Sequence, residues 1–575
     1  MHDEEVVSIQ LAADFLDEPF ALEMRGWTAV SQDCAPKIAA LASLANLGSA
    51  EPVARVTYRS HGNILVIAGD APGNAARAAE SLAETLHVTL LGAKSASTKV
   101  ISWSGSVESI GGYLGEFEIV IAGLNGASQP APAKFDLVLD FSREPLFGMR
   151  QPPQGYHHAG DSDASLAAIV EELRESVGDF EKPRFFAYRE EICAHSRSGI
   201  TGCDRCIEIC STAAISADGD HVKVDPHLCM GCGACSTVCP SGAMSYQFPR
   251  VADRGAQLKQ LLKAYREAGG REACIVFHDG ERARDLLVES AKAGIGLPPH
   301  ALPLATWHAA STGLDLLLGA IAYGATNVVV LAPGNIDAEY AQALREQMAL
   351  GETILHGLGY AGTHFALIEA ATPAQLEREL ATLALAQVPA ATASFVLSND
   401  KRTAIEFAIE HFARHAPARV DEIALPEGSP WGEVIVDRQK CTMCMACVGA
   451  CPESALMDGV DQPLLKFLER NCVQCGLCEA TCPEEAISLS SRLLLTPAVR
   501  QARIVNETQP FHCIRCNKPF GTRQVVDTMI GRLTGHSMFA GEGALRRLQM
   551  CADCRVVDMM SAKDEVSVLK LGGHD

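Results

Sequence analysis

The chain has 575 residues, 48 % of them hydrophobic, which predicts several domains with a core each. Its formal net charge of −22 disfavours binding to nucleic acid or to anionic lipid, because both need a basic protein surface, and favours protein partners with basic docking patches. The N-terminal "MHDEEVVSIQ" resembles no secretion signal, so we expect a cytoplasmic protein.

Residues 1–185 are expected to form an α/β domain. The segments "NILVIAG", "FEIVIAG" and "FDLVLDF" are typical of buried strands, and "NAARAAESLAETL" is typical of an amphipathic helix. The turn "AGDAPGNAAR" contains Gly69 and Gly73 but lacks the G-x-G-x-x-G pattern, so it supports nucleotide binding only weakly. Cys34 has no cysteine partner near it and receives no role.

Residues 186–250 contain a first pair of cysteine runs, "CDRCIEIC" at 203–210 and "CMGCGACSTVCP" at 229–240. The second run matches C-x2-C-x2-C-x3-C-P, which holds a [4Fe-4S] cluster in bacterial ferredoxins. In two-cluster ferredoxins the fourth cysteine of each run ligates the other cluster, so the runs interlock. The predicted ligands of one cluster are therefore Cys229, Cys232, Cys235 and Cys210.

The first run of this pair is incomplete, with three cysteines and Ser211 where proline is expected. Cys193 in "EEICAHSRSGITGC" supplies a fourth thiol, and Gly199 and Gly202 would let the longer loop bend. Without Cys193 the site would hold a three-iron cluster or take a non-cysteine ligand. His195 is the nearest substitute, although a solvated role in the loop is favoured for it. The predicted ligands are Cys193, Cys203, Cys206 and Cys239.

Residues 251–395 are expected to form a middle α/β domain. Strands "ACIVFH", "NVVVLA" and "HFALIEA" alternate with helices around "RARDLLVESAKA", "STGLDLLLGAIAYG" and "AEYAQALREQMALG", which predicts a small parallel sheet with helices on both faces. The most apolar stretch, 314–332, is interrupted by Asp315, Gly324 and Asn327, so a helix and a buried strand are predicted there and no membrane span. Cys274 is expected to be a buried apolar residue.

A helical linker at 396–436 is predicted to lead into a second dicluster module at 437–492. Both "CTMCMACVGACP" and "CVQCGLCEATCP" match the full ferredoxin pattern, so the module of two runs occurs twice. In a reducing compartment such thiols are metal ligands more often than disulfides. One cluster is assigned to Cys441, Cys444, Cys447 and Cys482, and its neighbour to Cys472, Cys475, Cys478 and Cys451.

Residues 493–575 are expected to form a zinc-ribbon-like tail. "HCIRCNKPFGT" and "MCADCR" give the pattern C-x2-C-x34-C-x2-C, and four thiols suit one tetrahedral metal, zinc by default and a single iron as the alternative. The spacing exceeds that of a usual ribbon, so a helix is expected at "TRQVVDTMIGRLTG". His512 is expected to be a bystander. The four ligands are Cys513, Cys516, Cys551 and Cys554.

The cysteine runs, together with "EEICAHSRSGITGC" and "SPWGEVIVDRQK", resemble the large four-cluster ferredoxin-type proteins that proteobacteria encode beside molybdenum or tungsten formate dehydrogenases. The middle segment resembles the delta subunit of methyl-viologen-reducing hydrogenase, but lacks that subunit's cluster-binding cysteines. The resemblance implies electron transfer near formate oxidation, with a formate dehydrogenase as the redox partner.

The expected fold is a multidomain α/β plus α+β protein, in which α/β domains join two dicluster (8Fe-8S) ferredoxin-like modules. The leading hypothesis is a soluble electron-transfer protein with four [4Fe-4S] clusters, more an electron carrier or oxidoreductase subunit than a stand-alone enzyme, and no catalytic residue is predicted. Two alternatives stay open: an oxidoreductase subunit that also binds flavin or NAD, and an accessory factor for assembly of the dehydrogenase.

Overall fold

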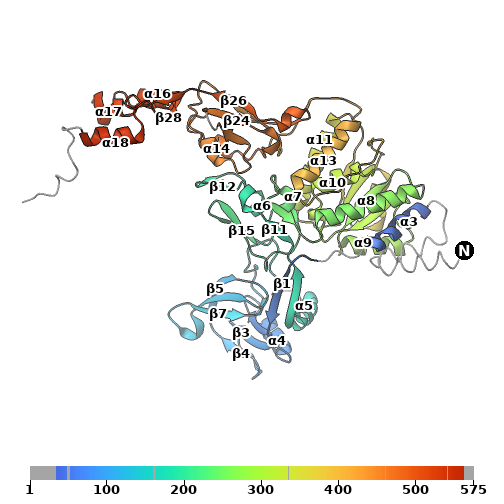
Figure 1. Cartoon of the computed structure of the whole chain (residues 1–575). Coiled ribbons are helices and arrows are strands. Elements are labelled where there is room, and N and C mark those ends of the chain that lie inside the picture. The colour runs from blue at the N-terminus through green and yellow to red at the C-terminus, as the bar shows by residue number, and fades with distance from the viewer. Residues whose placement is uncertain are drawn as a thin grey trace, which may run out of the picture. The chain divides into compact units, whose positions relative to one another are not determined.

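The computed structural model describes residues 34–47, 52–159, 163–280, 282–334, 336–459, 462–539 and 542–561 (Figure 1). The stretch "MHDEEVVSIQ" lies outside these residues. The chain divides into two compact units, the first comprising Met1–Glu190, Asp204–Asp218 and Val222–Pro417, and the second comprising Glu191–Cys203, Gly219–His221 and Ala418–Asp575. Across the described ranges, no helix is both long and apolar enough to cross a membrane.

The first unit begins with a five-stranded parallel sheet of order β4-β3-β2-β8-β9. Its strands are β2 (Asn63–Ile67), β3 (His87–Leu91), β4 (Ile101–Trp103), β8 (Leu137–Asp140) and β9 (Tyr156–His158), and its helices are α4 (Pro72–Leu82) and α5 (Asp163–Glu175). The predicted strands "NILVIAG" and "FDLVLDF" are thus confirmed. Gly69 has a φ of +46°, and a Cβ there would lie 2.4 Å from the backbone nitrogen of Ser142. The close approach of two chain segments therefore explains this glycine without a nucleotide.

The predicted strand "FEIVIAG" is β6 (Phe117–Ala122), but it belongs to a separate antiparallel sheet with β5 (Ser106–Gly111) and β7 (Ala131–Phe135). Phe117, Ile119 and Ile121 of β6 share one hydrophobic core with Leu65 and Val138 of the parallel sheet. Strands β1 (Arg55–Ser60) and β10 (Gly178–Pro183) form an antiparallel ribbon beside this domain.

The middle of the first unit is a parallel sheet of order β18-β17-β19-β20. Val276 and Val329 contribute to one face, which α9 and α12 cover. Phe365 faces the other way, where Gly351 of α11 approaches its ring. The elements are β17 (Cys274–His278), β18 (Ala301–Ala305), β19 (Asn327–Leu331), β20 (Phe365–Ile368), α9 (Arg282–Lys292), α10 (Leu314–Ala322), α11 (Ala338–Gly357) and α12 (Pro373–Ala381).

The three strands and three helices predicted for this domain are confirmed. The apolar stretch 314–332 forms a helix, α10, followed by a buried strand, β19, as predicted. Strand β18 was missed, because "ALPLA" carries a proline and no β-branched residue. Helices α3 (Ala35–Leu44) and α8 (Val251–Glu267) contact each other, and α13 (Lys401–His415) is the predicted helix of the linker (Figure 1). Cys274 is 2 % exposed in β17, as expected.

The elements around the first cysteine runs are short. They are β11 (Phe186–Tyr188), which pairs with β16 (Met244–Tyr246), helices α6 (Arg205–Glu208) and α7 (Ala234–Val238), and strands β14 (Ile215–Asp218) and β15 (His221–Val224), which form a two-stranded sheet. The last two strands lie in the connection between the two cysteine runs. In the second unit, β12 (Ser196–Arg197) and β13 (Ile200–Thr201) form a small hairpin.

The second unit places two three-stranded antiparallel sheets around the second pair of runs. Strand β25 (Ile487–Leu494) pairs with β22 (Gly432–Val436) and β21 (Glu422–Ala424), and β24 (Leu464–Phe467) pairs with β23 (Leu456–Asp458) and β26 (Arg503–Glu507). Helices α14 (Ala446–Ala450) and α15 (Leu477–Ala480) contain or adjoin the cysteines. The tail consists of β27 (Pro510–His512), β28 (Pro519–Thr522), α16 (Arg523–Leu533), α17 (Glu542–Arg547) and α18 (Ala552–Ser561), and α16 is the helix predicted there.

Candidate cluster and metal sites

The three regular C-x2-C-x2-C loops share one backbone conformation. In each loop, the residue before the second cysteine and the residue after it have a positive φ. This left-handed geometry curls the loop, and it costs non-glycine residues about 1 kcal/mol each. The six residues are Gly231 and Gly233, Met443 and Met445, and Gln474 and Gly476, with φ between 54° and 83°. The irregular run at 203–210 differs, because Arg205 already begins α6.

In the second unit the cysteines gather into two groups, each with one member from the other run. Burial is the largest cause that raises the pKa of the Cys447 thiol to about 12, and the charges of Cys441, Cys444 and Cys482 contribute to this rise. Burial likewise raises the pKa of Cys478, with contributions from Cys472, Cys475 and Cys451. Mutually repelling thiolates are stabilised when they bind a cationic iron centre. The structure therefore brings together both groups of residues that the interlocked assignment predicts.

In the first unit, a third group forms in the same way. Burial raises the pKa of Cys235 well above its ordinary value, and the charges of Cys232, Cys229 and Cys210 add to the effect. Burial also raises the pKa of Cys229, to about 11. Cys210 thus joins three cysteines of the other run, as predicted.

Two of these groups line enclosed, largely apolar cavities. The residues that line each cavity show whether it is suited to a cluster. Cys210, Cys229, Cys232 and Cys235 line one cavity together with Phe185, Ile215 and Tyr246. Cys451, Cys472, Cys475 and Cys478 line the other together with Val434, Leu456 and Leu489. A buried iron-sulfur cubane needs four thiols at its corners and apolar walls around it, so both cavities fit one.

The loop that carries Cys193 is the hairpin of β12 and β13. Its turn has Ser198 and Gly199 at φ of 53° and 77°, so the predicted bend at Gly199 is confirmed. The N–H of Cys203 donates to the Ala194 carbonyl over 2.9 Å, which closes the base of the hairpin beside Cys193. The long insertion between Cys193 and Cys203 therefore does not separate these two residues widely.

Side chains around this hairpin hold it in shape. Asp220 accepts the N–H of Ser198 and the hydroxyl of Ser196, each over 3.0 Å, and these bonds lower the pKa of its carboxyl. A Cβ on Gly202 would lie 2.6 Å from the Ala194 carbonyl oxygen, so this glycine serves close packing instead of a left-handed bend.

Cys193 and His195 are both buried, at 7 % and 5 % exposed. The Nδ1 atom of His195 lies 3.3 Å from the Cys203 carbonyl oxygen. The expectation of a solvated histidine is therefore wrong, because the side chain is buried and its ring nitrogen lies beside a backbone carbonyl instead of water. The other two predicted ligands of this cluster, Cys206 and Cys239, belong to the first unit.

Hydrogen bonds reach several of the cysteine sulfurs. Ala455 and Ala486 donate their N–H groups to Sγ of Cys451 and Cys482 over 3.2 and 3.4 Å, each from four residues further along the chain. Such N–H···S bonds stabilise negative charge on a cluster and raise its reduction potential. Met244 N donates to Cys239 Sγ over 3.4 Å, and Gln474 Nε2 donates to Cys472 Sγ over 3.3 Å.

Two lysines that sequence reasoning missed bond to the backbone of cluster cysteines. Lys182 Nζ donates to the Cys229 carbonyl over 2.8 Å, and Lys401 Nζ donates to the Cys239 carbonyl over 3.0 Å. Burial lowers the pKa of Lys182 to about 8, although the charges of Cys229 and Asp225 oppose the change. Neither lysine lies near these cysteines in sequence, so no sequence motif predicts the two contacts.

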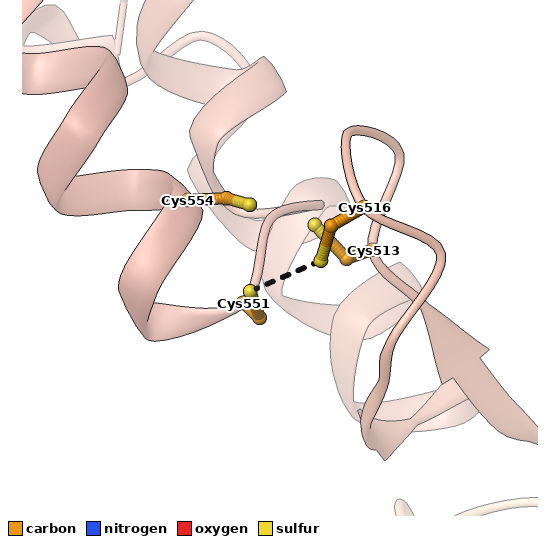
Figure 2. A group of neighbouring side chains, drawn as sticks. All are labelled: Cys513, Cys516, Cys551 and Cys554. Atoms are coloured by element: carbon orange, nitrogen blue, oxygen red, sulfur yellow. Dashed lines mark hydrogen bonds between the residues drawn. The ribbon is translucent and has the colours of Figure 1, made fainter.

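The four tail cysteines converge on one point (Figure 2). Cys513 and Cys516 lie between β27 and β28, whereas Cys551 and Cys554 lie at the start of α18. All four sulfurs lie within 4.8 Å of one another, and Cys516 and Cys551 are 3.6 Å apart. A Zn–S bond of about 2.3 Å puts tetrahedral ligands about 3.8 Å apart. The four residues therefore fit one tetrahedral metal ion.

The backbone around Cys513 favours the ionised form of its sulfur, whereas burial and hydrogen bonds with the other three thiols raise the pKa of Cys554 to about 12. Burial opposes ionisation of Cys513, but N–H groups of Cys516, Cys551 and Arg515 outweigh it and lower its pKa to about 6. A thiolate at neutral pH is the form that binds a metal.

A second group of metal-binding residue types, Glu352, His356 and His364, has a structural explanation. Both ring nitrogens of His364 are used, since Nδ1 lies 2.8 Å from Glu352 Oε2 and Nε2 lies 2.8 Å from the Gln387 carbonyl oxygen. This group fastens α11 to the start of β20.

Comparison with known proteins agrees with this geometry. Residues 201–243 match a family described as a 4Fe-4S dicluster domain, and residues 433–483 match a second family with the same description. The chain therefore carries two 4Fe-4S dicluster domains of ferredoxin type, here called the first and second dicluster domains. Its four-cysteine tail site lies outside both matches.

Individual relatives are similar over short stretches. "Hydrogenase-4 component A" of Escherichia coli (strain K12) is 38 % identical over 52 residues, which is 9 % of this chain and 25 % of the relative. The "Isethionate sulfite-lyase activating enzyme" of Oleidesulfovibrio alaskensis is 42 % identical over 75 residues, 12 % of this chain and 24 % of the relative. "Ferredoxin 7Fe" of Hydrogenibacillus schlegelii is 38 % identical over 42 residues, 7 % of this chain and 54 % of the relative. The chain thus spans about a quarter to a half of each relative.

Proposed function

We propose that the protein is an electron carrier that holds four [4Fe-4S] clusters, two in each dicluster domain. The observation that carries the proposal is the grouping of cysteines from different runs around shared apolar cavities. Two ligand sets line such cavities, Cys210, Cys229, Cys232 and Cys235 in one and Cys451, Cys472, Cys475 and Cys478 in the other. The third set, Cys441, Cys444, Cys447 and Cys482, rests on the electrostatic effect of the other three thiols on Cys447.

The fourth cluster is assigned to Cys193, Cys203, Cys206 and Cys239. The hairpin supports this assignment, because it buries Cys193 and fastens Cys203 to Ala194 at the base of the loop. If Cys193 does not ligate, the site holds a three-iron cluster or takes another ligand. The iron content of the Cys193→Ala variant tests whether Cys193 ligates. It should be lower than that of the wild type if Cys193 is a ligand, and unchanged if Cys193 is not.

Each cluster, when bound, accepts and releases one electron at a time. The residues of the chain anchor it, exclude water and stabilise the added charge. Leu477, at 0 % exposed, and Ile209, at 8 %, are buried apolar side chains of the cysteine runs that would shield bound clusters from water. The N–H groups of Ala455 and Ala486 supply positive dipoles at sulfur.

At the tail site we propose structural zinc. Four cysteines complete a tetrahedral shell and leave no position for a substrate, which is typical of structural zinc sites. A single redox-active iron is the alternative, and the metal content of the purified protein distinguishes the two.

A formate dehydrogenase is the redox partner that we propose, on the resemblance of the cysteine runs. The relatives include a protein named as a hydrogenase component, which is compatible with a redox enzyme as partner. The flavin or NAD alternative gains no support from the Gly69 turn, since packing against Ser142 accounts for that glycine.

Formate-dependent reduction of the clusters tests the function. The protein, prepared without oxygen, is mixed with formate and a catalytic amount of the cognate formate dehydrogenase, and loss of the iron-sulfur absorbance is followed. We expect bleaching that requires both formate and enzyme. If the clusters stay oxidised beside active enzyme and respond only to dithionite, this carrier role fails and the assembly-factor alternative takes its place.

A further inference from the structure

Two lysines from elements outside the cysteine runs reach into the first dicluster domain. Lys182 lies in β10, and its Nζ donates to the carbonyl oxygens of His227 and Cys229 over 2.7 and 2.8 Å. Lys401 is the first residue of α13, and its Nζ donates to the carbonyl oxygens of Ser236, Thr237 and Cys239 over 2.9, 2.6 and 3.0 Å. Each lysine therefore contacts the backbone of one predicted cluster ligand.

The surroundings hold both side chains in place. Lys182 Nζ lies 4.7 Å from the centre of the Tyr58 ring, and the Tyr58 hydroxyl donates to the same His227 carbonyl over 2.6 Å. Lys401 meets three carbonyl oxygens at the end of α7, where the helix leaves such groups without partners. Only the protonated amine has three N–H groups to donate to three acceptors, so this geometry fits an ammonium ion.

Carboxylates face these lysines and partly offset their charge, Asp225 at Lys182 and Asp315 at Lys401. Arg205 and Arg402 also act on Lys401, but as cations they repel it. Burial raises the pKa of Asp315, which weakens its ability to neutralise Lys401.

We propose that Lys182 and Lys401 raise the reduction potentials of the two clusters of the first dicluster domain. The inference rests on the proposed function, because it requires clusters at these cysteines. Reduction adds one negative charge to a cluster, and a fixed cation nearby stabilises the reduced form more than the oxidised form. Both lysines act through the carbonyl groups of ligand cysteines, so they are positioning residues that tune the clusters from outside the ligand shell.

The second dicluster domain has a different charge arrangement. Its Arg492 and Arg503 both pair with the buried Glu469, over 2.9 and 2.6 Å, and with Glu433, over 3.0 and 2.9 Å. Carboxylates thus offset these arginines directly.

The test is a redox titration of the full-length holoprotein, followed by electron paramagnetic resonance. In Lys182→Met the cluster of Cys229 should become harder to reduce, and in Lys401→Met the cluster of Cys239. At a fixed potential the ratio of reduced to oxidised cluster should fall about tenfold, which is about 59 mV for one electron. Lys182→Arg and Lys401→Arg keep the charge and should recover most of the wild-type potential.

Lys259→Met is a matched control, because Lys259 Nζ also donates to two carbonyl oxygens, those of Ser394 and Phe395, without contacting a cysteine. Its potentials should equal those of the wild type. Unchanged potentials in both methionine variants, with wild-type iron content, would overturn the inference while leaving the proposed function intact. Wild-type protein that binds no cluster in this domain would overturn both.

If the methionine variants lose iron, glutamine at the same positions keeps a hydrogen-bond donor and removes the charge. A lowered potential in Lys182→Gln and Lys401→Gln then supports the inference. Wild-type potentials in the glutamine variants contradict it, since they would assign the lysines a purely structural role.

Discussion

The thiol of Cys482 lies close enough to that of Cys447 to raise its pKa, although the two residues belong to different cysteine runs. Likewise, Cys451 of the first run raises the pKa of Cys478 in the second run. This proximity agrees with the predicted interlocking of the two runs of the second dicluster domain, in which each cluster takes one ligand from the other run.

Replacing Cys482 with alanine should damage the cluster of Cys441, Cys444 and Cys447, because it removes the fourth ligand of that site. The neighbouring cluster should remain, with iron falling by one to four atoms per chain. Electron paramagnetic resonance of the reduced variant measures this, since coupled clusters lose their interaction when one is missing.

Cys451→Ala is the matched control and should damage the opposite cluster, that of Cys472, Cys475 and Cys478. A Cys482→Ala variant that loses the cluster of Cys472, Cys475 and Cys478 and keeps its neighbour would contradict the interlocked assignment.

At the tail site, Cys554→Ser should release the bound metal and leave cluster iron unchanged. A missing thiolate opens the tetrahedral shell, and structural zinc sites depend on all four ligands. Metal analysis after gel filtration measures the loss of about one zinc per chain. Cys274→Ala, which changes a buried cysteine outside this site, should retain the zinc. Full zinc in Cys554→Ser would rule out this ligand set.

Much of the site was predictable from sequence, because cluster ligation imposes a fixed cysteine spacing on a local loop. The regular runs at 229–240, 441–452 and 472–483 predicted which cysteines lie close together in the structure. The buried strands β17 and β19 were predictable for a related reason, since a short apolar run bounded by turns has few other uses.

The remaining features depend on contacts between distant segments. Lys182 and Lys401 look like surface charges in sequence, and only the tertiary fold brings them to Cys229 and Cys239. The burial of His195 depends on the tertiary surroundings of the hairpin of β12 and β13, and the segment "SRSGIT" does not signal that hairpin strongly. Strand β6 was identified, but its apolar alternation does not reveal which sheet it joins.

Glu469→Gln should destabilise the second dicluster domain by about 2 kcal/mol, because it removes ion pairs that satisfy a carboxylate only 4 % exposed. Loss of cluster absorbance in denaturant measures the change. Glu479→Gln alters an exposed residue of the same domain and should cost less than about 0.5 kcal/mol. Equal effects of the two substitutions would contradict this role.

Glu469 should also make the stability of the second dicluster domain depend on pH. Burial acts to raise the pKa of Glu469, but hydrogen bonds from Arg492 and Arg503 outweigh it and lower the pKa. Because the folded-state pKa is below the unfolded value of about 4.3, the stabilisation is present above that value. It should be lost as pH falls through the folded-state pKa, and the Glu469→Gln variant should lack this part of the acid sensitivity.

Gly231→Ala should impair the cluster of Cys229, Cys232 and Cys235. Its φ of +80° is unfavourable for alanine, and a Cβ would lie 2.7 Å from the Phe185 ring, so we expect a loss of about 2 kcal/mol. Gly449→Ala in α14 is the control, because nothing lies within 4 Å of its Cβ position. Iron retention during dilution should fall for the first variant only, and equal retention in both would contradict the role of the left-handed loop.

Metal and sulfide analysis of protein purified without oxygen tests the central claim most directly. Four [4Fe-4S] clusters and one tail metal predict about sixteen irons, an equal amount of acid-labile sulfide and about one zinc per chain. A value near fifteen irons would mean a three-iron cluster at the Cys193 hairpin. A value near eight after careful reconstitution would contradict the account, because one of the two dicluster domains would then hold no clusters.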